Sequence, residues 1–217
     1  MLFIVATPIG NLQDITLRAL DTLKSVDIIA AEDTRQTQKL LAHFKIKKQL
    51  VSFHKFSREN KLNQIIGLLK SGKNIALVSD AGTPGISDPG QKLVAAARDN
   101  NIKIIPIPGP SAITTILSTA GINADSFLFV GFIPKKKGRK TFLKELSKIS
   151  VPVVLFESPA RVLKTLKDIR EHLGERDVIV GRELTKIHEE ILSLPVSQMI
   201  NYFVDNQPKG EFVIVIT

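Results

Sequence analysis

Short apolar runs alternate with amphipathic helical patterns along the first half of this 217-residue chain. In the helical stretches, apolar residues recur every three or four positions, as Leu17, Leu20 and Leu23 do, which is the period of a helix with one buried face. The apolar runs have the length of buried strands and lie at 2–6, 27–31, 50–54, 75–78 and 103–107. Repeated strand–helix units predict a doubly wound parallel sheet.

Polar residues mark the expected starts of these helices. The candidates are Asp14 or Thr16 for the first helix, Thr34 or Thr37 for the second, Ser57 for the third and a start near Gln91 for the fourth. Gly72 is expected to end the third helix, because glycine favours the backbone conformation at which helices stop.

The strand–helix alternation stops at residues 106–111, Pro-Ile-Pro-Gly-Pro-Ser. Three prolines and one glycine make a stiff connector. We therefore expect two α/β domains, residues 1–109 and 110–217. The second domain is richer in strands, with candidates at 127–132, 151–156, 178–181, 190–194 and 212–216, which favours a mixed sheet. Its helices are expected at 111–118, 141–148, 159–173 and 196–204, and Ser158-Pro159 is a typical helix start.

Composition excludes several classes of protein. The chain has no cysteine, so it has neither disulfides nor a thiolate nucleophile, and its four histidines do not have the spacing of a metal site. No apolar run approaches the roughly 20 residues that span a bilayer, and the N-terminus lacks the basic residues of a signal peptide. We expect a cytoplasmic protein without a metal. The net charge of +9 favours a polyanionic partner such as nucleic acid.

Residues 79–90, Ser-Asp-Ala-Gly-Thr-Pro-Gly-Ile-Ser-Asp-Pro-Gly, form the most distinctive segment. They follow a buried strand and precede a helix, and their glycines and prolines predict a loop that is shaped but stiff. Loops at the carboxyl ends of strands bind ligands in open α/β sheets, although a long structural turn is the alternative. The loop after the first strand holds only one glycine, Gly10, unlike an ordinary dinucleotide-binding turn.

Two further turns are candidate ligand contacts. Pro108-Gly-Pro-Ser-Ala112 leads directly into a helix N-terminus, where free N–H groups suit a carboxylate or another acceptor. Lys209-Gly-Glu-Phe212 opens the last strand, and Gly210 permits close backbone approach. Each turn has a purely structural alternative, as a linker or a simple turn.

The densest charge run is Lys135-Lys-Lys-Gly-Arg-Lys140, predicted to lie on a loop at a strand end. Its five cations are Lys135, Lys136, Lys137, Arg139 and Lys140. Neutralising about five phosphates of a single strand would give a log–log salt slope of roughly −3.5. We favour an RNA contact over plain solvated surface.

Charged residues also follow two apolar strands of the second half. Arg182, Glu183, Thr185 and Lys186 follow one strand, and Glu157 follows another. A carboxylate and a lysine placed together form either an ordinary salt bridge or a pair that binds ligand and handles protons.

Taken as an ordered set, these segments resemble the ribosomal RNA small-subunit methyltransferase I family, a branch of the tetrapyrrole methylase superfamily. The segments are ATPIGNL at 6–12, SDAGTPGISDPG at 79–90, PGPSA at 108–112, GFIP with the basic run at 131–140, FESPAR at 156–161, RELTK at 182–186 and KGEF at 209–212. The resemblance implies two α/β domains with S-adenosylmethionine (SAM) in the cleft between them, usually in a homodimer. It also implies methylation of the 2′-hydroxyl of a cytidine ribose in the decoding region of small-subunit rRNA.

The resemblance assigns residues to roles. The cofactor site would comprise Pro8, Asp80, Ala81, Gly82, Thr83, Ile86, Ser111, Ala112, Phe156 and Gly210. Glu183 and Lys186 are the candidates for accepting the hydroxyl proton or stabilising the alkoxide. Many members continue beyond the KGEF strand into a small helical segment, whereas this chain stops at Thr217. We therefore expect either a shorter member or a chain without that segment, with lower RNA affinity.

Two other functions are compatible with these residues. One is a tetrapyrrole methyltransferase on the same fold, and the other is an RNA-binding module without catalysis. The latter predicts salt-dependent RNA affinity without SAM binding.

Overall fold

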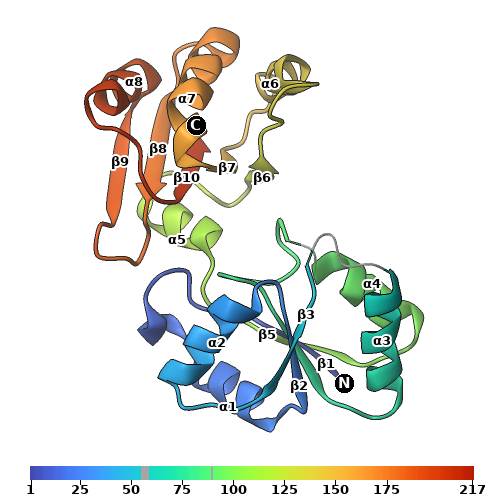
Figure 1. The fold of residues 1–217 in the computed structure, drawn as a ribbon. Coiled ribbons are helices and arrows are strands. Elements are labelled where there is room, and N and C mark those ends of the chain that lie inside the picture. Colours follow the sequence, from blue (N-terminus) through green and yellow to red (C-terminus); the bar gives the residue numbers. More distant parts are fainter. Residues whose placement is uncertain (55–58, 89) are drawn as a thin grey trace. The chain divides into compact units, whose positions relative to one another are not determined.

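The computed structural model describes residues 1–54, 59–88 and 90–217. The chain divides into two compact units, Met1–Ser111 and Ala112–Thr217 (Figure 1). Each unit has one five-stranded sheet, the first entirely parallel and the second mixed. The predicted α/β class is therefore confirmed.

The first unit is built from the expected strand–helix units. Its elements are β1 (Leu2–Val5), a 3-10 turn η1 (Leu12–Asp14), α1 (Leu17–Ser25), β2 (Ile28–Ala31), α2 (Thr34–His43), β3 (Gln49–Ser52), α3 (Glu59–Lys70), β4 (Ile75–Val78), α4 (Gly90–Asp99) and β5 (Ile104–Ile107). The sheet order is β3-β2-β4-β1-β5. β1, the first strand of the chain, pairs in parallel with both β4 and β5.

Both faces of this sheet are covered, which explains why its inner strands β1, β2 and β4 are continuously apolar. Alternate residues of β2 enter different cores. Ile29 and Ala31 pack with the apolar residues of α1 and α2, whereas Ile28 and Ala30 pack with those of α3 and α4. Figure 1 shows these two helix pairs on opposite faces of the sheet.

The structure shows which of the predicted N-cap residues begin α1 and α2. Thr16 caps α1 by accepting a hydrogen bond from the Ala19 N–H, so it is preferred over Asp14, which lies in η1. The prediction for α2 misses the cap itself. The helix begins at Thr34, but Asp33 is its N-cap and accepts from the Arg35 N–H. The predicted cap Ser57 lies outside the described residues.

The second unit has fewer crossover connections. Its elements are α5 (Ala112–Thr119), β6 (Leu128–Phe132), α6 (Arg139–Leu146), β7 (Val153–Glu157), α7 (Pro159–Leu173), β8 (Asp177–Arg182), β9 (Glu190–Pro195), α8 (Val196–Asp205) and β10 (Phe212–Ile216). The sheet order is β6-β7-β10-β8-β9, and only β6 and β7 pair in parallel.

Helices α6, α7 and α8 share one core with the sheet of this unit, through buried residues such as Leu143, Leu166 and Phe203. Helix α5 packs against β10 on the sheet. Gly181 of β8 makes this contact possible, since a methyl group there would lie 2.8 Å from the Cδ1 atom of Ile116 in α5. In the described part of the chain, no helix is long and apolar enough to cross a membrane.

Two expected helix starts in this unit differ in detail. Ser158 is the N-cap residue of α7 and Pro159 its first residue, but the serine side chain makes no capping hydrogen bond. Its hydroxyl lies 3.5 Å from Glu157 Oε1 instead. Helix α6 begins at Arg139, two residues before the expected Thr141, because Gly138 turns the chain with φ +80° and Arg139 is held by tertiary partners.

Candidate functional site

In the first unit, the carboxyl ends of the neighbouring strands β1 and β4 lie side by side, and the chain leaves them toward opposite faces of the sheet. The two strands are neighbours, yet α1, which follows β1, and α4, which follows β4, cover opposite faces of the sheet. In open α/β sheets ligands bind beyond the carboxyl ends of strands at such a point. The topology therefore selects the loops after β1 and β4.

These two loops are joined by a short backbone bridge. The N–H of each of Thr7 and Gly82 donates to the carbonyl of the other, both at 2.9 Å. The buried Thr7 hydroxyl also donates to the Ser79 carbonyl at 3.2 Å. Gly82 has φ +76°, a conformation that glycine adopts without strain. The bridge fixes the start of the glycine- and proline-rich loop beside β1.

Asp88 organises the other end of this loop. Its Oδ1 accepts from the N–H groups of Gly85 at 2.7 Å and Gly90 at 2.8 Å. Burial raises the pKa of Asp88, although these hydrogen bonds favour its charged form. Our sequence reasoning did not single out Asp88. The Ser-Asp-Pro-Gly pattern was the available signal, because aspartate side chains in turns bond to backbone groups nearby in sequence.

Two more segments reach the same edge of the sheet. Gly109 lies against the end of β1, where a methyl group on it would be 3.1 Å from Ala6 Cβ. Asp80 Oδ1 accepts from the Asp33 N–H at 2.9 Å, which connects the long loop to the start of α2. Next to them, the pKa of Glu32 is raised by burial and by the charges of Asp80 and Asp88. Four strand ends thus contribute to this edge.

The predicted cofactor residues of the first unit all lie on these segments. They are Pro8, Asp80, Ala81, Gly82, Thr83, Ile86 and Ser111. Pro8 and Gly82 are buried, while Asp80 and Ala81 are exposed. Ile86 is 48% exposed, a large apolar side chain presented by a loop.

In the second unit, Glu183 and Lys186 form a direct ion pair. Lys186 Nζ lies 2.9 Å from Glu183 Oε1 and 2.8 Å from Glu211 Oε2. Glu183 Oε1 also accepts from the Glu211 N–H at 2.8 Å. The segment between β8 and β9 is tightly bent, with positive φ at Glu183 (+49°) and Thr185 (+66°). Glu211 is a member of this group that the sequence reasoning missed.

This pairing shifts both pKa values toward the charged forms. For Glu183, burial raises the pKa, but hydrogen bonds from Lys186 and the Glu211 N–H outweigh it, so the pKa is lowered. For Lys186, burial lowers the pKa, but the hydrogen bonds to Glu211 and Glu183 outweigh it, so the pKa is raised. The group therefore presents a carboxylate that is a weak base and a lysine that stays protonated.

Gly210 and Phe156 complete the predicted residues of the second unit, with Ala112 at the start of α5. Gly210 has φ +87° and lies directly against Glu183. Phe156 of β7 makes an edge-to-face contact with Phe129, with ring centroids 5.0 Å apart, and lies 5.9 Å from Phe132. No group of three His, Cys, Asp or Glu residues in the described ranges could hold a metal ion.

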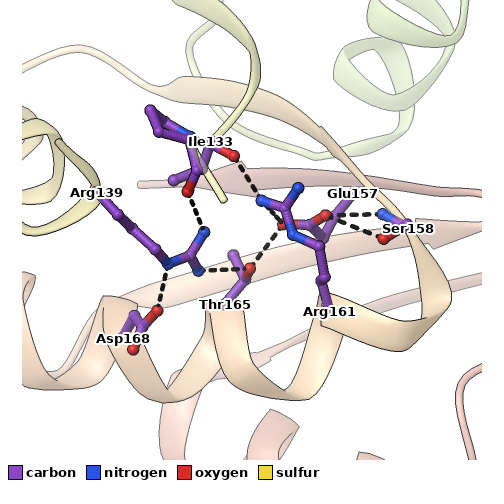
Figure 2. A network of polar contacts seen from close by, with 8 residues as sticks. Ile133, Arg139, Glu157, Ser158, Arg161, Thr165 and Asp168 are labelled. Atoms are coloured by element: carbon purple, nitrogen blue, oxygen red, sulfur yellow. Dashed lines mark hydrogen bonds and ion pairs between the residues drawn. The ribbon is translucent and has the colours of Figure 1, made fainter. Parts of the chain in front are cut away.

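The basic run contains one residue that differs from the rest. The lysines at 135, 136, 137 and 140 are exposed, as expected. Arg139 is buried and its side chain is only 7% exposed, with its Nε 2.6 Å from Asp168 Oδ2. Figure 2 shows its guanidinium among protein partners on α7. Because these partners already occupy it, we no longer assign Arg139 to RNA.

Glu157 belongs to the same buried network. Its Oε2 accepts from the Thr165 hydroxyl at 2.7 Å and lies 3.2 Å from Arg161 Nη2, and its side chain is 0% exposed (Figure 2). Of the two readings that the sequence left open for Glu157, the structure shows the salt bridge.

Comparison with known proteins gives consistent results at three levels. The family model described as Tetrapyrrole (Corrin/Porphyrin) Methylases matches residues 1–200. Among solved structures, a diphthine synthase has a TM-score of 0.79 at 15% identity, covering 99% of this chain and 88% of that one. A cobalt precorrin-4 methyltransferase has a TM-score of 0.72 at 19% identity, covering 99% and 93%. At such identities the structures establish similarity of fold alone.

The curated relatives are much more similar in sequence. A protein of Synechocystis named ribosomal RNA small subunit methyltransferase I is 50% identical over 218 residues, covering 100% of this chain and 78% of that relative. A Thermotoga maritima protein of the same name is 47% identical, covering 100% of this chain and 97% of the relative. A third, from Bacillus subtilis, is 47% identical and covers 100% and 74%.

Proposed function

Because this chain belongs to the ribosomal RNA small-subunit methyltransferase I family of the tetrapyrrole methylases, we propose that it methylates small-subunit ribosomal RNA. More specifically, we propose that it transfers the methyl group of SAM to the 2′-hydroxyl of a cytidine ribose in the decoding region. The proposal rests on identity of 47–50% along the whole chain to relatives that carry this name.

The first unit has features that fit a nucleoside-containing methyl donor. The loops after β1 and β4 lie at the topological position where such ligands bind, and Ile86 offers exposed apolar surface to an adenine. A methyl group on Gly82 would lie 3.5 Å from Ile9 Cγ2 and 3.8 Å from the Pro110 carbonyl oxygen, so the positive φ of +76°, rather than lack of space, favours glycine at this position. We propose that Pro8, residues 80–83, Ile86 and Ser111 hold the donor, and on the family relationship alone we propose Ala112, Phe156 and Gly210 as cofactor residues of the second unit. When bound, SAM supplies a methyl group already activated by its sulfonium.

The second unit supplies the charges that the ribose hydroxyl needs. Loss of the hydroxyl proton requires an acceptor or a cation that stabilises the developing alkoxide. The raised pKa of Lys186 favours the second role for the lysine, and the lowered pKa of Glu183 makes it a poor proton acceptor. We propose that the hydroxyl proton passes to solvent, that Lys186 stabilises the developing alkoxide, and that Glu183 and Glu211 hold the ammonium in place. Good alignment of the hydroxyl can contribute about 7–11 kcal/mol.

The four exposed lysines at 135, 136, 137 and 140 are the proposed RNA contacts. With Arg139 removed from the set, neutralisation of about four phosphates predicts a log–log salt slope of roughly −2.8. The net charge of +9 supports the same class of partner. We also propose, on the family relationship alone, that the protein acts as a homodimer in the cytoplasm.

Methylation of purified small ribosomal subunits with radiolabelled SAM, followed by nucleoside mass spectrometry, tests the proposal. The expected product is 2′-O-methylcytidine. A tetrapyrrole methyltransferase would instead transfer the label to a porphyrin acid and leave the RNA unlabelled. An RNA-binding module without catalysis would bind RNA in a salt-dependent way and show no SAM binding by calorimetry.

A further inference from the structure

The lysine loop, residues 133–138, is held at its beginning by two arginines that follow it in sequence. Arg161 Nη2 donates to the Ile133 carbonyl, and Arg139 Nη1 donates to the Pro134 carbonyl at 3.1 Å (Figure 2). Because Arg139 is also the residue that directly follows the loop, its side chain joins the two ends of the segment. Gly138, with φ +80°, makes the turn between them.

Both arginines are themselves fixed from several sides. Arg139 Nε pairs with Asp168 at 2.6 Å, and its Nη2 donates to the Thr165 hydroxyl at 2.9 Å. That hydroxyl donates in turn to Glu157, which also pairs with Arg161. We call these five residues the arginine clamp: Arg139, Glu157, Arg161, Thr165 and Asp168. All of its side chains come from the end of β7, from α7 and from the first residue of α6.

The clamp has two cations and two carboxylates, so its charges cancel. The lysines at 135, 136 and 137 are exposed, and none of them makes an ion pair with another residue in the described part of the chain. The clamp therefore leaves the positive potential of the loop to the lysines alone.

Stability alone does not account for such a network. Burying ion pairs costs desolvation free energy, and well-packed apolar residues of similar volume are often equally stable or more so. What charged, forked groups add is geometry, because a guanidinium donates in fixed directions to several acceptors. Here two of those acceptors are main-chain carbonyls of the lysine loop.

We propose that Arg139 and Arg161 are positioning residues, which hold the lysine loop in the shape that binds consecutive phosphates of a single-stranded RNA segment. The inference rests on the proposed function for its RNA partner. A loop fixed before binding loses less conformational entropy when it binds, which increases affinity without any new contact. Neither arginine needs to touch the RNA.

Positioning and direct phosphate contact differ in their salt dependence. The Arg139→Lys variant keeps the charge but cannot donate to Asp168, Thr165 and Pro134 together. We expect its dissociation constant for a short single-stranded RNA of decoding-region sequence to rise about tenfold, with an unchanged salt slope. The triple variant Lys135→Ala, Lys136→Ala, Lys137→Ala should instead lower the magnitude of the slope by about 2. In methylation assays, Arg139→Lys should raise the KM for RNA and leave kcat and SAM affinity unchanged.

Arg170→Gln is the matched control, because Arg170 lies on α7 in an exposed pair with Glu175 at 3.7 Å. It should change the dissociation constant for this RNA less than twofold. If thermal melting shows that Arg139→Lys does not fold, Thr165→Val is the second test, because it removes only one hydroxyl from the clamp. Its KM for RNA should also rise, but by less than that of Arg139→Lys.

The inference is overturned if a folded Arg139→Lys or Thr165→Val variant binds RNA as the wild type does. It is also overturned if the salt slope of Arg161→Gln drops by about 0.7, since that is the loss of one direct phosphate contact. In either case wild-type methylation of the ribosomal subunit would be unaffected, and the proposed function would remain. Absence of both methylation and RNA binding in the wild type would contradict the proposed function and this inference together.

Discussion

Gly210 leaves the space that the Glu183 side chain occupies. A methyl group on residue 210 would lie 2.4 Å from Cδ and 2.5 Å from Oε1 of Glu183. The same Oε1 accepts from Lys186 and from the Glu211 N–H. Gly210, just before β10, therefore determines where the Glu183 carboxylate lies after β8. That carboxylate in turn holds Lys186 in place.

Replacing Gly210 with alanine should displace Glu183 and lower both stability and turnover. The substitution combines a positive φ with an overlap, at costs of about 1–2 and about 1–3 kcal/mol. Urea unfolding and kcat measure the two effects. Gly72→Ala is the control, because Gly72 has φ +90° but nothing within 4 Å of the added methyl. It should cost about 1–2 kcal/mol and leave kcat intact. Equal effects of the two substitutions would contradict the role of the overlap.

Lys186→Met should reduce kcat by about 10²–10³, the range seen when a group that stabilises developing negative charge is removed. SAM affinity, measured by calorimetry, should change little. Lys148→Met provides a matched control, since Lys148 and Glu145 form a pair at the same spacing of three residues but in an exposed position. If both Lys186→Met and Glu183→Gln retained nearly normal turnover, we would abandon the catalytic assignment of this pair.

The Glu183 carboxylate should contribute to stability at neutral pH and lose that contribution in acid. Its folded-state pKa is lowered from the ordinary value of 4.5, so the unfolded state binds a proton first. The contribution is therefore complete above about pH 4.5 and disappears as the pH falls through the lower, folded pKa. As the pH falls over that acid range, the unfolding free energy of the Glu183→Gln variant should decrease less than that of the wild type. Parallel pH profiles of the two proteins would refute the assignment.

Asp88→Asn should be tolerated, whereas Asp88→Ala should not. Asparagine keeps the oxygen that accepts from Gly85 and Gly90, but alanine leaves both N–H groups without it, at about 1–3 kcal/mol each where they are buried. Burial raises the folded-state pKa of Asp88 above the unfolded value of 3.8. The unfolded state therefore ionises first, and the free energy of unfolding decreases as the pH rises from 3.8 to the folded-state pKa. The stability of Asp88→Asn relative to the wild type should thus increase with pH over that interval. Thermal melting at several pH values measures both effects.

Local sequence predicted most of the secondary structure correctly. The ranges of β4, α7 and β10 agree with the expected 75–78, 159–173 and 212–216. In each case the signal is the period of the apolar residues, which short-range sterics and burial translate directly into strand or helix. Where a boundary moved, as at Arg139 in α6, the residue responsible binds partners on another helix.

The candidate site could be predicted only as a set of loops. Glycine and proline patterns and the family resemblance indicated the segments after β1, β4 and β5, because backbone restrictions are local properties of these residues. The partners within them were not visible. Nothing in the sequence distinguishes Arg139 from the lysines beside it, and no motif marks Glu211 as a partner of Lys186.

The sequence by itself therefore determined the α/β class, the order of the elements and the positions of the glycine-rich and lysine-rich loops. Tertiary structure alone decided which charges are free and which are used internally. Arg139 lies 29 residues from Asp168, and Lys186 lies 25 from Glu211. Whether such distant groups meet depends on how the strands pair and the helices pack, and burial then determines whether a charge faces water or a partner.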